Sequence, residues 1–271
     1  QPVRGEHGFA APLDTVFPAV TCSVQASFLT GLPPSGHGAV GNGWYFRDLA
    51  QVMLWRQSNQ LVHGEKLYEA AARRFGARTA KMFWWWNMYA PHVAWSVTPR
   101  PEYHANGLKK PGLYSEPAAL QGELQQQLGP FPLFDFWGPK AGIKSTEWIV
   151  SSALAVIARH DPELMLVYLP HLDYDHQRFG PDDARSVQAV RDLDAQCDRA
   201  SRHELVHQRN SQSDDQRHLS VVVADFAIAD NRVVTPVVDD VGEQTSQFMA
   251  SDRRVMHERE FAQHFVALIA A

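Results

Sequence analysis

One continuous apolar run and a second run that is apolar except for Ser220 constrain the fold of this 271-residue chain more than any other feature. Residues 164–169 read LMLVYL, and residues 219–224 read LSVVVA. Strands that are apolar at every position are typical of a parallel sheet that is covered on both faces. A helical pattern precedes the first run, at 145–159, and another follows it, at 181–207, so helices and strands alternate. The sequence therefore predicts one α/β domain with a mostly parallel central sheet flanked by helices, spanning residues 1–271.

A further helix and strand are predicted earlier in the chain, at 65–75 and 78–89. The second of these segments reads RTAKMFWWWNMY and is unusually rich in aromatic residues. Trp84 and Trp86 are candidates to stack on a nucleobase or on another flat leaving group. The alternative is that the aromatic residues alternate between two faces of a strand and pack into the core, since such residues are ordinary strand formers.

Proline and glycine are frequent between residues 97 and 139, which favours an insertion rather than further core structure. One helical segment is expected inside it, at 117–128, where leucines recur every four residues. Active-site lids often come from segments of this kind, so a cap over 97–139 is one interpretation. The other interpretation is an insertion on the surface of the domain, and the composition fits both interpretations.

Composition narrows the classes of partner. The net charge is −5 with mixed signs, so the chain has no basic surface of the kind that binds duplex nucleic acid. No apolar run approaches the roughly 20 residues that a membrane helix needs, and no secretory leader is visible after Gln1. Two cysteines, Cys22 and Cys197, make no disulfide framework. A cytoplasmic protein is expected, and its oligomeric state is not predicted.

A segment rich in hydroxyl groups lies early in the chain. The apolar residues of 16–20 suit the end of a buried strand, and a helical pattern then runs from Thr21 to a stop at Gly31. The start of a helix favours a phosphate or another anion, because its N–H groups and its dipole point there. The alternative is that Thr21 or Ser23 merely caps the helix. A serine-esterase role for Ser23 is a third possibility, although no Gly-x-Ser-x-Gly motif surrounds it.

A second polar cluster directly follows the apolar run 164–169. It reads PHLDYDHQ and contains two aspartates and two histidines within six residues. Carboxylate and imidazole groups suit zinc, manganese or a similar divalent ion. Ligands bind at the carboxyl ends of parallel strands, where Asp225 also lies after the run 219–224. The alternative is a solvated turn, since Asp and His populate such turns as well.

Several of these residues stand at fixed spacings that form a motif. The motif comprises Thr21, Thr30-Gly31, Pro34, His37-Gly38 and Asn42, and after the strand Asp173 with Gly180-Pro181. In this register the chain resembles the type I phosphodiesterase/nucleotide pyrophosphatase family, which belongs to the alkaline phosphatase superfamily.

The resemblance implies an activity and roles for particular residues. Thr21 would attack phosphorus while held on a metal, and Asn42 would donate to a non-bridging phosphate oxygen. Thr21, Asp173, His176 and Asp225 would bind one or two divalent ions, with zinc favoured and manganese as the alternative. The substrate would be a small-molecule phosphodiester or related phosphate ester, and His37-Gly38 would be structural.

The chain departs from the family pattern at four of its metal-binding positions. The expected histidine falls on Gln177, one residue after His176, and Phe226 stands where a second histidine would follow Asp225. No strand that ends in a metal-binding aspartate is evident before Asp14, and the late candidates His257 and His264 lack matching flanks. Two functions therefore stay open: a metal-dependent hydrolase with a phospho-threonine intermediate, or a catalytically impaired relative that binds a ligand or a partner.

Overall fold

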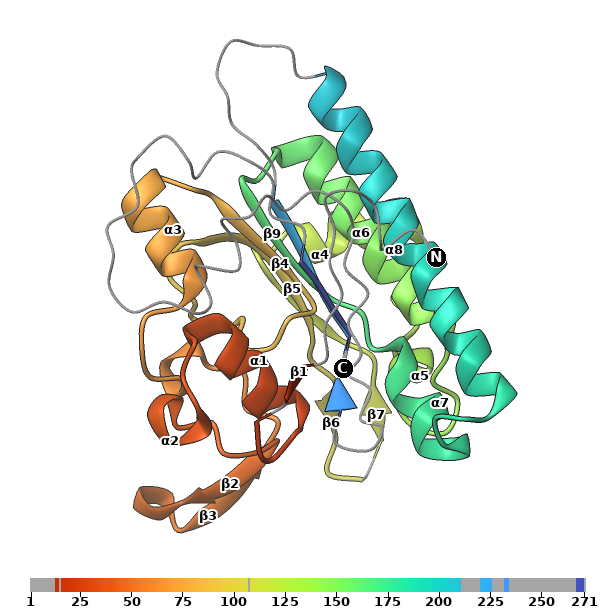
Figure 1. Cartoon of the computed structure of the whole chain (residues 1–271). Helices are drawn as coiled ribbons and strands as arrows, with labels where there is room; N and C mark the ends of the chain where they lie inside the picture. The colour runs from red at the N-terminus through yellow and green to blue at the C-terminus, as the bar shows by residue number, and fades with distance from the viewer. Residues whose placement is uncertain are drawn as a thin grey trace.

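A six-stranded sheet forms the centre of the molecule in the computed structural model (Figure 1). The structure describes residues 13–14, 16–106, 108–210, 220–225, 232–233 and 267–270. The strand order is β12–β10–β9–β4–β5–β8, and each neighbouring pair is parallel except β5 with β8. The predicted mostly parallel α/β sheet is therefore confirmed. Its strands are β4 (Thr79–Met82), β5 (Val93–Pro99), β8 (Leu113–Glu116), β9 (Leu164–Tyr168), β10 (Ser220–Asp225) and β12 (Ala267–Ala270).

Helices lie on both sides of this sheet (Figure 1). The longer helices gather on one side, where α6 packs against α4, α5 and α8 and against strands β4 and β9. The N-terminal helices lie on the other side, and α1 contacts α2 and α3. The bounds are α1 (Thr21–Thr30), α2 (Pro34–His37), α3 (Leu67–Phe75), α4 (Leu120–Leu128), α5 (Leu133–Phe136), α6 (Ile143–His160), α7 (His171–Phe179) and α8 (Ala184–Asn210).

Smaller elements surround the sheet. They form three two-stranded pairs and two short 3₁₀ helices. The hairpins β2–β3 and β6–β7 project from the lower end of the molecule in the view of Figure 1. The bounds are β1 (Leu13–Asp14) with β11 (Arg232–Val233), β2 (Gly43–Phe46) with β3 (Gln51–Leu54), β6 (Glu102–Tyr103) with β7 (Lys109–Lys110), η1 (Arg47–Leu49) and η2 (Asn59–Leu61).

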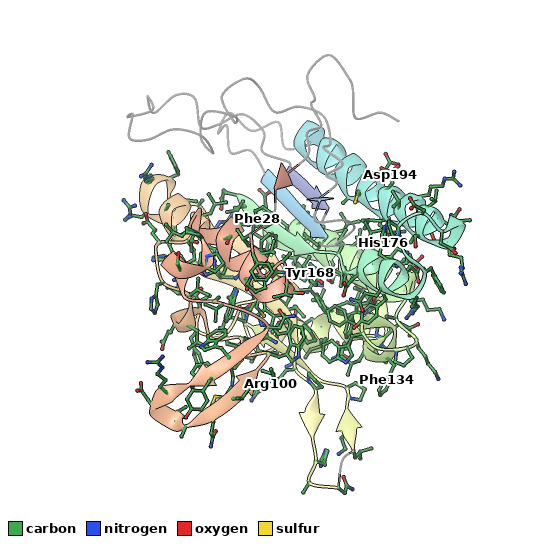
Figure 2. All side chains as sticks on the ribbon, turned by 60° about the horizontal axis from the view of Figure 1, so that its bottom comes forward. Phe28, Arg100, Phe134, Tyr168, His176 and Asp194 are labelled. Carbon is green, nitrogen blue, oxygen red and sulfur yellow. The ribbon has the colours of Figure 1, made fainter. Side chains whose placement is uncertain are left out.

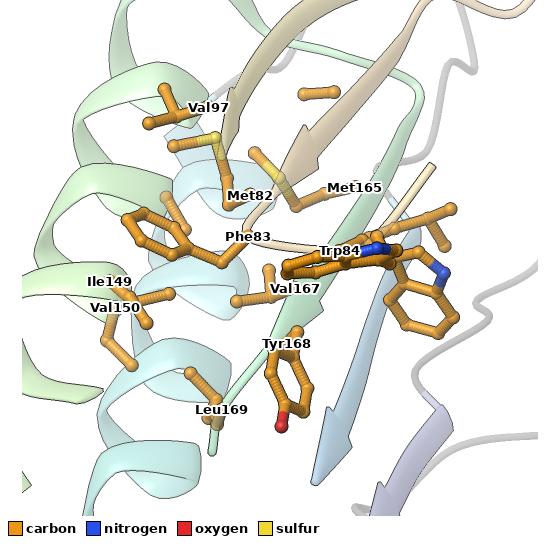
Figure 3. Packing of buried hydrophobic residues seen from close by; sticks show 14 of the residues in the cluster. Met82, Phe83, Trp84, Val97, Ile149, Val150, Met165, Val167, Tyr168 and Leu169 are labelled. Carbon is orange, nitrogen blue, oxygen red and sulfur yellow. The ribbon is translucent and has the colours of Figure 1, made fainter. Parts of the chain in front are cut away.

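The core is built where β4 and β9 meet α6. Every residue of β9 is buried, as its continuous apolar sequence predicts, and every residue of β4 is buried as well. Met82 and Phe83 at the end of β4 pack toward Ile149 and Val150 of α6 (Figure 3). Because both faces of these strands are covered, each buried side chain of this size contributes about 1.5–3 kcal/mol to folding. This packing fixes the position of the strand ends.

The structure corrects two predicted element boundaries. Residues 16–20 form bends rather than a strand end, and the Phe17 side chain is 93% exposed. Ser145 is not the N-cap of α6, which begins at Ile143 after Gly142. The Ser145 hydroxyl instead donates to the Gly142 carbonyl at 3.1 Å, from inside the first turn. Both errors arose because short local patterns fit more than one position.

The strand predicted for residues 78–89 is shorter than expected. It ends at Met82, and the backbone then adopts left-handed conformations at Phe83 (φ 60°), Trp86 (φ 62°) and Tyr89 (φ 58°). The three consecutive tryptophans therefore lie in the connection after β4, which we call the tryptophan loop (residues 83–87). The stacking interpretation and the core-packing interpretation both placed these tryptophans on a strand, and on this point both were wrong.

The region 97–139 contains parts of the main sheet. Val97 to Pro99 belong to β5, and β8 pairs with β5 from Ser96↔Glu116 to Pro99↔Leu113. The part that leaves the sheet is the β6–β7 hairpin, while α4 and α5 pack against α6. A cap over the whole region remains a prediction. No helix among the described residues is long and apolar enough to cross a membrane.

Candidate active site

Thr21 is the first residue of α1, in a helix start that carries no acidic side chain. The residue before it, Val20, is extended and makes no side-chain cap. Thr21 is half-buried, so the residue is accessible at the end of the helix where the backbone N–H groups are free of helical partners. The helix ends as predicted, at Gly31 with φ 68°, a conformation that favours glycine. The dipole of a helix with this start favours an anion next to Thr21.

Asn42 is brought to the same helix start by a hydrogen bond. The backbone N–H of Cys22 donates to the Asn42 Oδ1 at 2.9 Å. An asparagine amide has one acceptor oxygen and one donor NH₂ group. Because the oxygen is engaged by Cys22, the group that Asn42 can offer to an oxyanion is its Nδ2 donor. The structure thus brings together two of the residues that the sequence singled out.

The tryptophan loop is also hydrogen-bonded to the N-terminal half of α1. The Trp85 N–H donates to Gln25 Oε1 at 2.6 Å, and the Trp86 Nε1–H donates to the Cys22 carbonyl at 3.2 Å. These residues follow β4 directly along the chain. The first turn of α1 therefore sits at the carboxyl end of β4.

Other nucleophile candidates in the first turn of α1 are less suitable than Thr21. Burial raises the pKa of the Cys22 thiol, so this residue stays protonated. The Ser23 side chain is fully buried, which disfavours the esterase interpretation because no substrate reaches it in this structure. Among these three neighbouring residues, Thr21 is the one with solvent access.

His37 has a structural place, in agreement with the expectation for His37-Gly38. The Ala39 N–H donates to His37 Nδ1 at 3.1 Å, so the ring proton is on Nε2, which donates to the Ser27 hydroxyl at 2.9 Å. Burial lowers the pKa of His37 and keeps its ring neutral. Gly38 has a φ of 80°, where a side chain would be strained. The pair joins α2 to α1.

The second polar cluster forms helix α7 rather than a turn. Its candidate ligands bond within their own helix: Gln177 Nε2 donates to Asp173 Oδ1 at 2.7 Å. His176 Nδ1 donates to the Leu172 carbonyl at 2.9 Å, which leaves its Nε2 lone pair for a ligand. Because successive residues of a helix are rotated by about 100°, His176 does not occupy the direction of Gln177. Burial raises the pKa of Asp173, against the opposing effects of Gln177 and His176.

Arg178 anchors α7 to the rest of the molecule. Its guanidinium donates to the carbonyls of Gly138, Pro139 and Ala141 at 3.0–3.1 Å, and to Asp175 at 2.9 Å. The anchor lies at the end of the helix, two turns from its start. It fixes the helix without contacting the candidate ligands.

Three neighbouring strands bring the candidate residues to one edge of the sheet. β9 lies between β4 and β10, and all three are parallel. The first turn of α1 is held at the end of β4, α7 follows β9, and Asp225 is the last residue of β10, which α7 contacts. In Figure 2, Tyr168 at the end of β9 appears between Phe28 of α1 and His176 of α7. With strands about 4.8 Å apart, the ends of β4 and β10 are separated by about 10 Å.

The described side chains alone do not assemble a metal centre. No three His, Cys, Asp or Glu side chains in the described ranges are grouped closely enough to hold an ion. Asp173 and His176 offer a pair at most, and for Asp225 the structure describes the strand but not the side chain. The predicted positions of Phe226, His257 and His264 lie outside the described residues.

The two candidate stacking residues are buried. Trp84 is 1% exposed and Trp86 is 0% exposed, so neither ring presents a face to solvent in this structure. Their role in substrate binding stays a prediction. The sequence did not reveal that Trp86 donates a hydrogen bond to α1, nor that Gln25 of α1 accepts one from the backbone N–H of Trp85. A polar side chain inside an otherwise apolar helix face was the available signal for Gln25.

Comparison with known proteins identifies the family. The model of the type I phosphodiesterase / nucleotide pyrophosphatase family matches residues 5–234. The chain belongs to this family. A search of curated proteins finds no match.

Two solved structures similar to this family member are both phosphonoacetate hydrolase from Sinorhizobium meliloti 1021. The complex with phosphonoformate is 15% identical with a TM-score of 0.47, and the match covers 77% of this chain and 46% of that one. The complex with phosphonoacetate is 16% identical with a TM-score of 0.47, with coverage of 86% and 57%. The chain thus spans about half the length of these proteins.

Proposed function

We propose that this protein hydrolyses a phosphodiester or a related phosphate ester, with Thr21 as the nucleophile. The observation that carries the proposal is the arrangement at the start of α1. The half-buried Thr21 hydroxyl lies in a helix start without acidic residues, and Asn42 is hydrogen-bonded to the next residue. Membership of the type I phosphodiesterase / nucleotide pyrophosphatase family supports the reaction class.

The reaction would proceed in two displacements at phosphorus. The Thr21 oxygen forms a bond to phosphorus as the bond to the leaving alcohol breaks, and a phospho-threonine results. Solvent water accepts the hydroxyl proton as the new bond forms, and the leaving alkoxide takes a proton from water to depart as an alcohol. Water then attacks phosphorus, releases the phosphate product and restores the Thr21 hydroxyl.

The groups around Thr21 suit the charge that develops on the phosphate oxygens. The Nδ2 of Asn42 can donate to a non-bridging oxygen, while its Oδ1 stays on the Cys22 N–H. The positive end of the α1 dipole adds to this stabilisation. A donor of this kind, held in place before the reaction and meeting a charged oxygen, contributes about 1.5–3 kcal/mol to lowering the barrier.

A divalent ion is part of the proposal, with zinc favoured over manganese and one or two ions bound. Thr21, Asp173, His176 and Asp225 are its proposed ligands. Their elements meet at the carboxyl edge of β4, β9 and β10, which supports the assignment. When bound, such an ion lowers the pKa of a coordinated hydroxyl and neutralises phosphate charge.

The experiment combines metal analysis with turnover of bis-p-nitrophenyl phosphate. The proposal expects a bound divalent ion, release of p-nitrophenol, and loss of that release in Thr21→Ala. Thr21→Ser, which keeps a hydroxyl at the same atom position, serves as the matched control and retains measurable turnover. Metal-loaded wild-type protein that releases no p-nitrophenol would argue against hydrolysis.

A second candidate function is binding of a ligand or partner without turnover. Among the described side chains, no three potential metal ligands are grouped closely enough to hold an ion, and this favours the alternative. Metal-free protein that lacks turnover, yet binds a phosphate ester with an affinity reduced by Asn42→Ala, would support this alternative. The cytoplasmic location also stays a proposal, and it is consistent with two buried free thiols, Cys22 and Cys197.

A further inference from the structure

Lys81 is an ionisable residue in the middle of the core. Lys81 lies in β4, between β5 and β9 in the sheet, and is 0% exposed. Lysine is almost never fully buried unless it has partners, because its ammonium group loses hydration. Burial lowers the pKa of Lys81 well below its usual value; the Lys66 charge adds to this effect and Glu69 opposes it.

The partners of Lys81 belong to the tryptophan loop. Its Nζ donates to the carbonyls of Trp85 and Trp86, each at 3.1 Å. The ring of Tyr68 lies 4.9 Å from the same nitrogen, in a cation–π arrangement. Two donor hydrogens of the amine are thus matched by two acceptor oxygens, and this pairing is satisfied whether or not the third proton is present.

The tryptophan loop needs such a donor because its backbone leaves the sheet abruptly. Phe83 and Trp86 have left-handed conformations, which non-glycine residues rarely adopt without support from their surroundings. The carbonyls that Lys81 meets are part of this turn, and a buried carbonyl without a partner is unfavourable. Lys81 therefore stabilises the shape of the loop from inside the core.

The same two loop residues hold the first turn of α1. The Trp85 N–H donates to Gln25, and the Trp86 indole donates to the carbonyl of Cys22. Cys22 in turn donates its N–H to Asn42 and follows Thr21 in the chain. Hydrogen bonds therefore link Lys81 to Asn42 through Trp86 and Cys22, and Thr21 is joined to this set by its peptide bond to Cys22.

We propose that Lys81 is a positioning residue for the reaction, which sets the place of Thr21 and Asn42 through the tryptophan loop. The inference rests on the proposed function for its catalytic consequence. It does not require Lys81 to touch the substrate. A misplacement of about 1 Å in a reacting group can cost about 100-fold in rate, so a residue at this distance from the chemistry can control turnover.

The test uses Lys81→Met, which keeps the length of the side chain but removes the donors. Leu124→Ala is the matched control, because Leu124 is fully buried as well but lies in α4, which packs against α6, β5 and β8. Two readouts are compared at a temperature where both variants stay folded. They are the kcat and KM for bis-p-nitrophenyl phosphate, and the hydrogen exchange of the peptide that contains residues 21–25.

In Lys81→Met we expect kcat to fall about 10- to 100-fold with KM changed less than about twofold. Exchange in residues 21–25 should quicken by at least about tenfold, while Leu124→Ala leaves both readouts near wild type. Unchanged exchange and kcat in folded Lys81→Met would overturn the inference. Equal effects in Leu124→Ala would overturn it as well, since a general loss of stability would then explain them.

Two further measurements keep the outcomes separate. If Lys81→Met does not fold, Lys81→Gln carries the test, because its neutral amide keeps two donor hydrogens and should show a smaller change in the same direction. If the wild type hydrolyses no phosphate ester, the proposed function fails. The exchange of residues 21–25 then still decides whether Lys81 holds the start of α1.

Discussion

The two helices at the carboxyl edge of the sheet are held in different ways. In α1, the residues next to Thr21 bond to partners far away in the sequence: Cys22 to Asn42 and Trp86, and Gln25 to Trp85. In α7, the candidate ligands bond inside their own helix, Asp173 to Gln177 and His176 to Leu172. One long-range tie of α7 is Arg178, at its far end.

This difference separates a preorganised half of the site from an adaptable half. Groups fixed by tertiary hydrogen bonds keep their geometry before the substrate arrives, which is what stabilisation of a transition state requires. Asp173 can exchange its local partner Gln177 for an ion at little cost, and His176 can bind an ion through Nε2 while Nδ1 stays on Leu172. We therefore propose that the nucleophile and the oxyanion donor lie on the α1 side and that ion binding falls mainly to the α7 side.

The largest expected effect is the loss of the nucleophile on the α1 side. Thr21→Ala should lower kcat by about 1,000-fold or more, because no other hydroxyl of the first turn reaches solvent. The free energy of unfolding should change by less than about 1 kcal/mol, since Thr21 is not a helix cap here. Steady-state kinetics and denaturant unfolding measure both. Full activity in Thr21→Ala would contradict the assignment of the nucleophile to the α1 side.

The next effect concerns the α7 side. Asp173→Asn should lower both bound metal and kcat, the latter by about 100-fold, because a neutral amide is a poorer ligand for a divalent ion than a carboxylate. Asp175→Asn is the control, since Asp175 pairs with Arg178 rather than with the proposed ion. It should change kcat less than about threefold. Metal content is measured in all proteins, and normal content in Asp173→Asn would contradict the assignment.

Asn42 offers a smaller and more selective test. Asn42→Asp keeps an acceptor for the Cys22 N–H but removes the Nδ2 donor, so stability should hold while kcat falls about 10- to 100-fold. Asn42→Ala should lower kcat similarly and also cost about 1 kcal/mol of stability, because the Cys22 N–H loses its partner. Equal stability losses in the two variants would show that the hydrogen bond to Cys22 does not hold the helix start.

The smallest effect lies at the opposite edge of the sheet, where Arg78 and Glu163 pair at 2.9 Å. Burial alone would raise the pKa of Glu163, but hydrogen bonds from Arg78 outweigh it and lower this pKa. A lowered pKa in the folded state gives stability that is present above the ordinary glutamate pKa and is lost as the pH falls. Glu163→Gln should therefore lower the free energy of unfolding by about 0.5–1 kcal/mol at pH 7, allowing for the exposure of Arg78.

The change at Glu163 should leave kcat unaltered, because the pair lies at the amino end of β4 and β9. Its stability difference from wild type should shrink as the pH is lowered below about 4. Urea unfolding at a series of pH values gives the profile. A reduced kcat would indicate that the two edges of the sheet are coupled.

The features that the sequence predicted well are those that depend on local pattern. The strands β9 and β10 follow from their largely apolar sequences, and the end of α1 follows from Gly31, which has a positive φ. The start of α6 was misjudged because Ser145 is a good cap in isolation, yet Gly142 occupies that position.

The features that the sequence could not predict depend on tertiary contacts. Residues 83–87 have strand-forming side chains, but the buried amine of Lys81 and the bonds to α1 favour a left-handed turn over an extended chain. The bond between Asn42 and Cys22 joins residues 20 positions apart and leaves no local signal. Residues 171–179 have the composition of a turn, yet they form a helix that Arg178 anchors.

The central claim is that the Thr21 oxygen forms the bond to phosphorus. The most direct measurement is mass spectrometry of enzyme quenched in acid during turnover of bis-p-nitrophenyl phosphate, followed by mapping of the peptide that contains residues 21–25. The account predicts a p-nitrophenyl phosphoryl group on Thr21 that is absent from Thr21→Ala. An active enzyme that carries the phosphoryl group on another residue would contradict it.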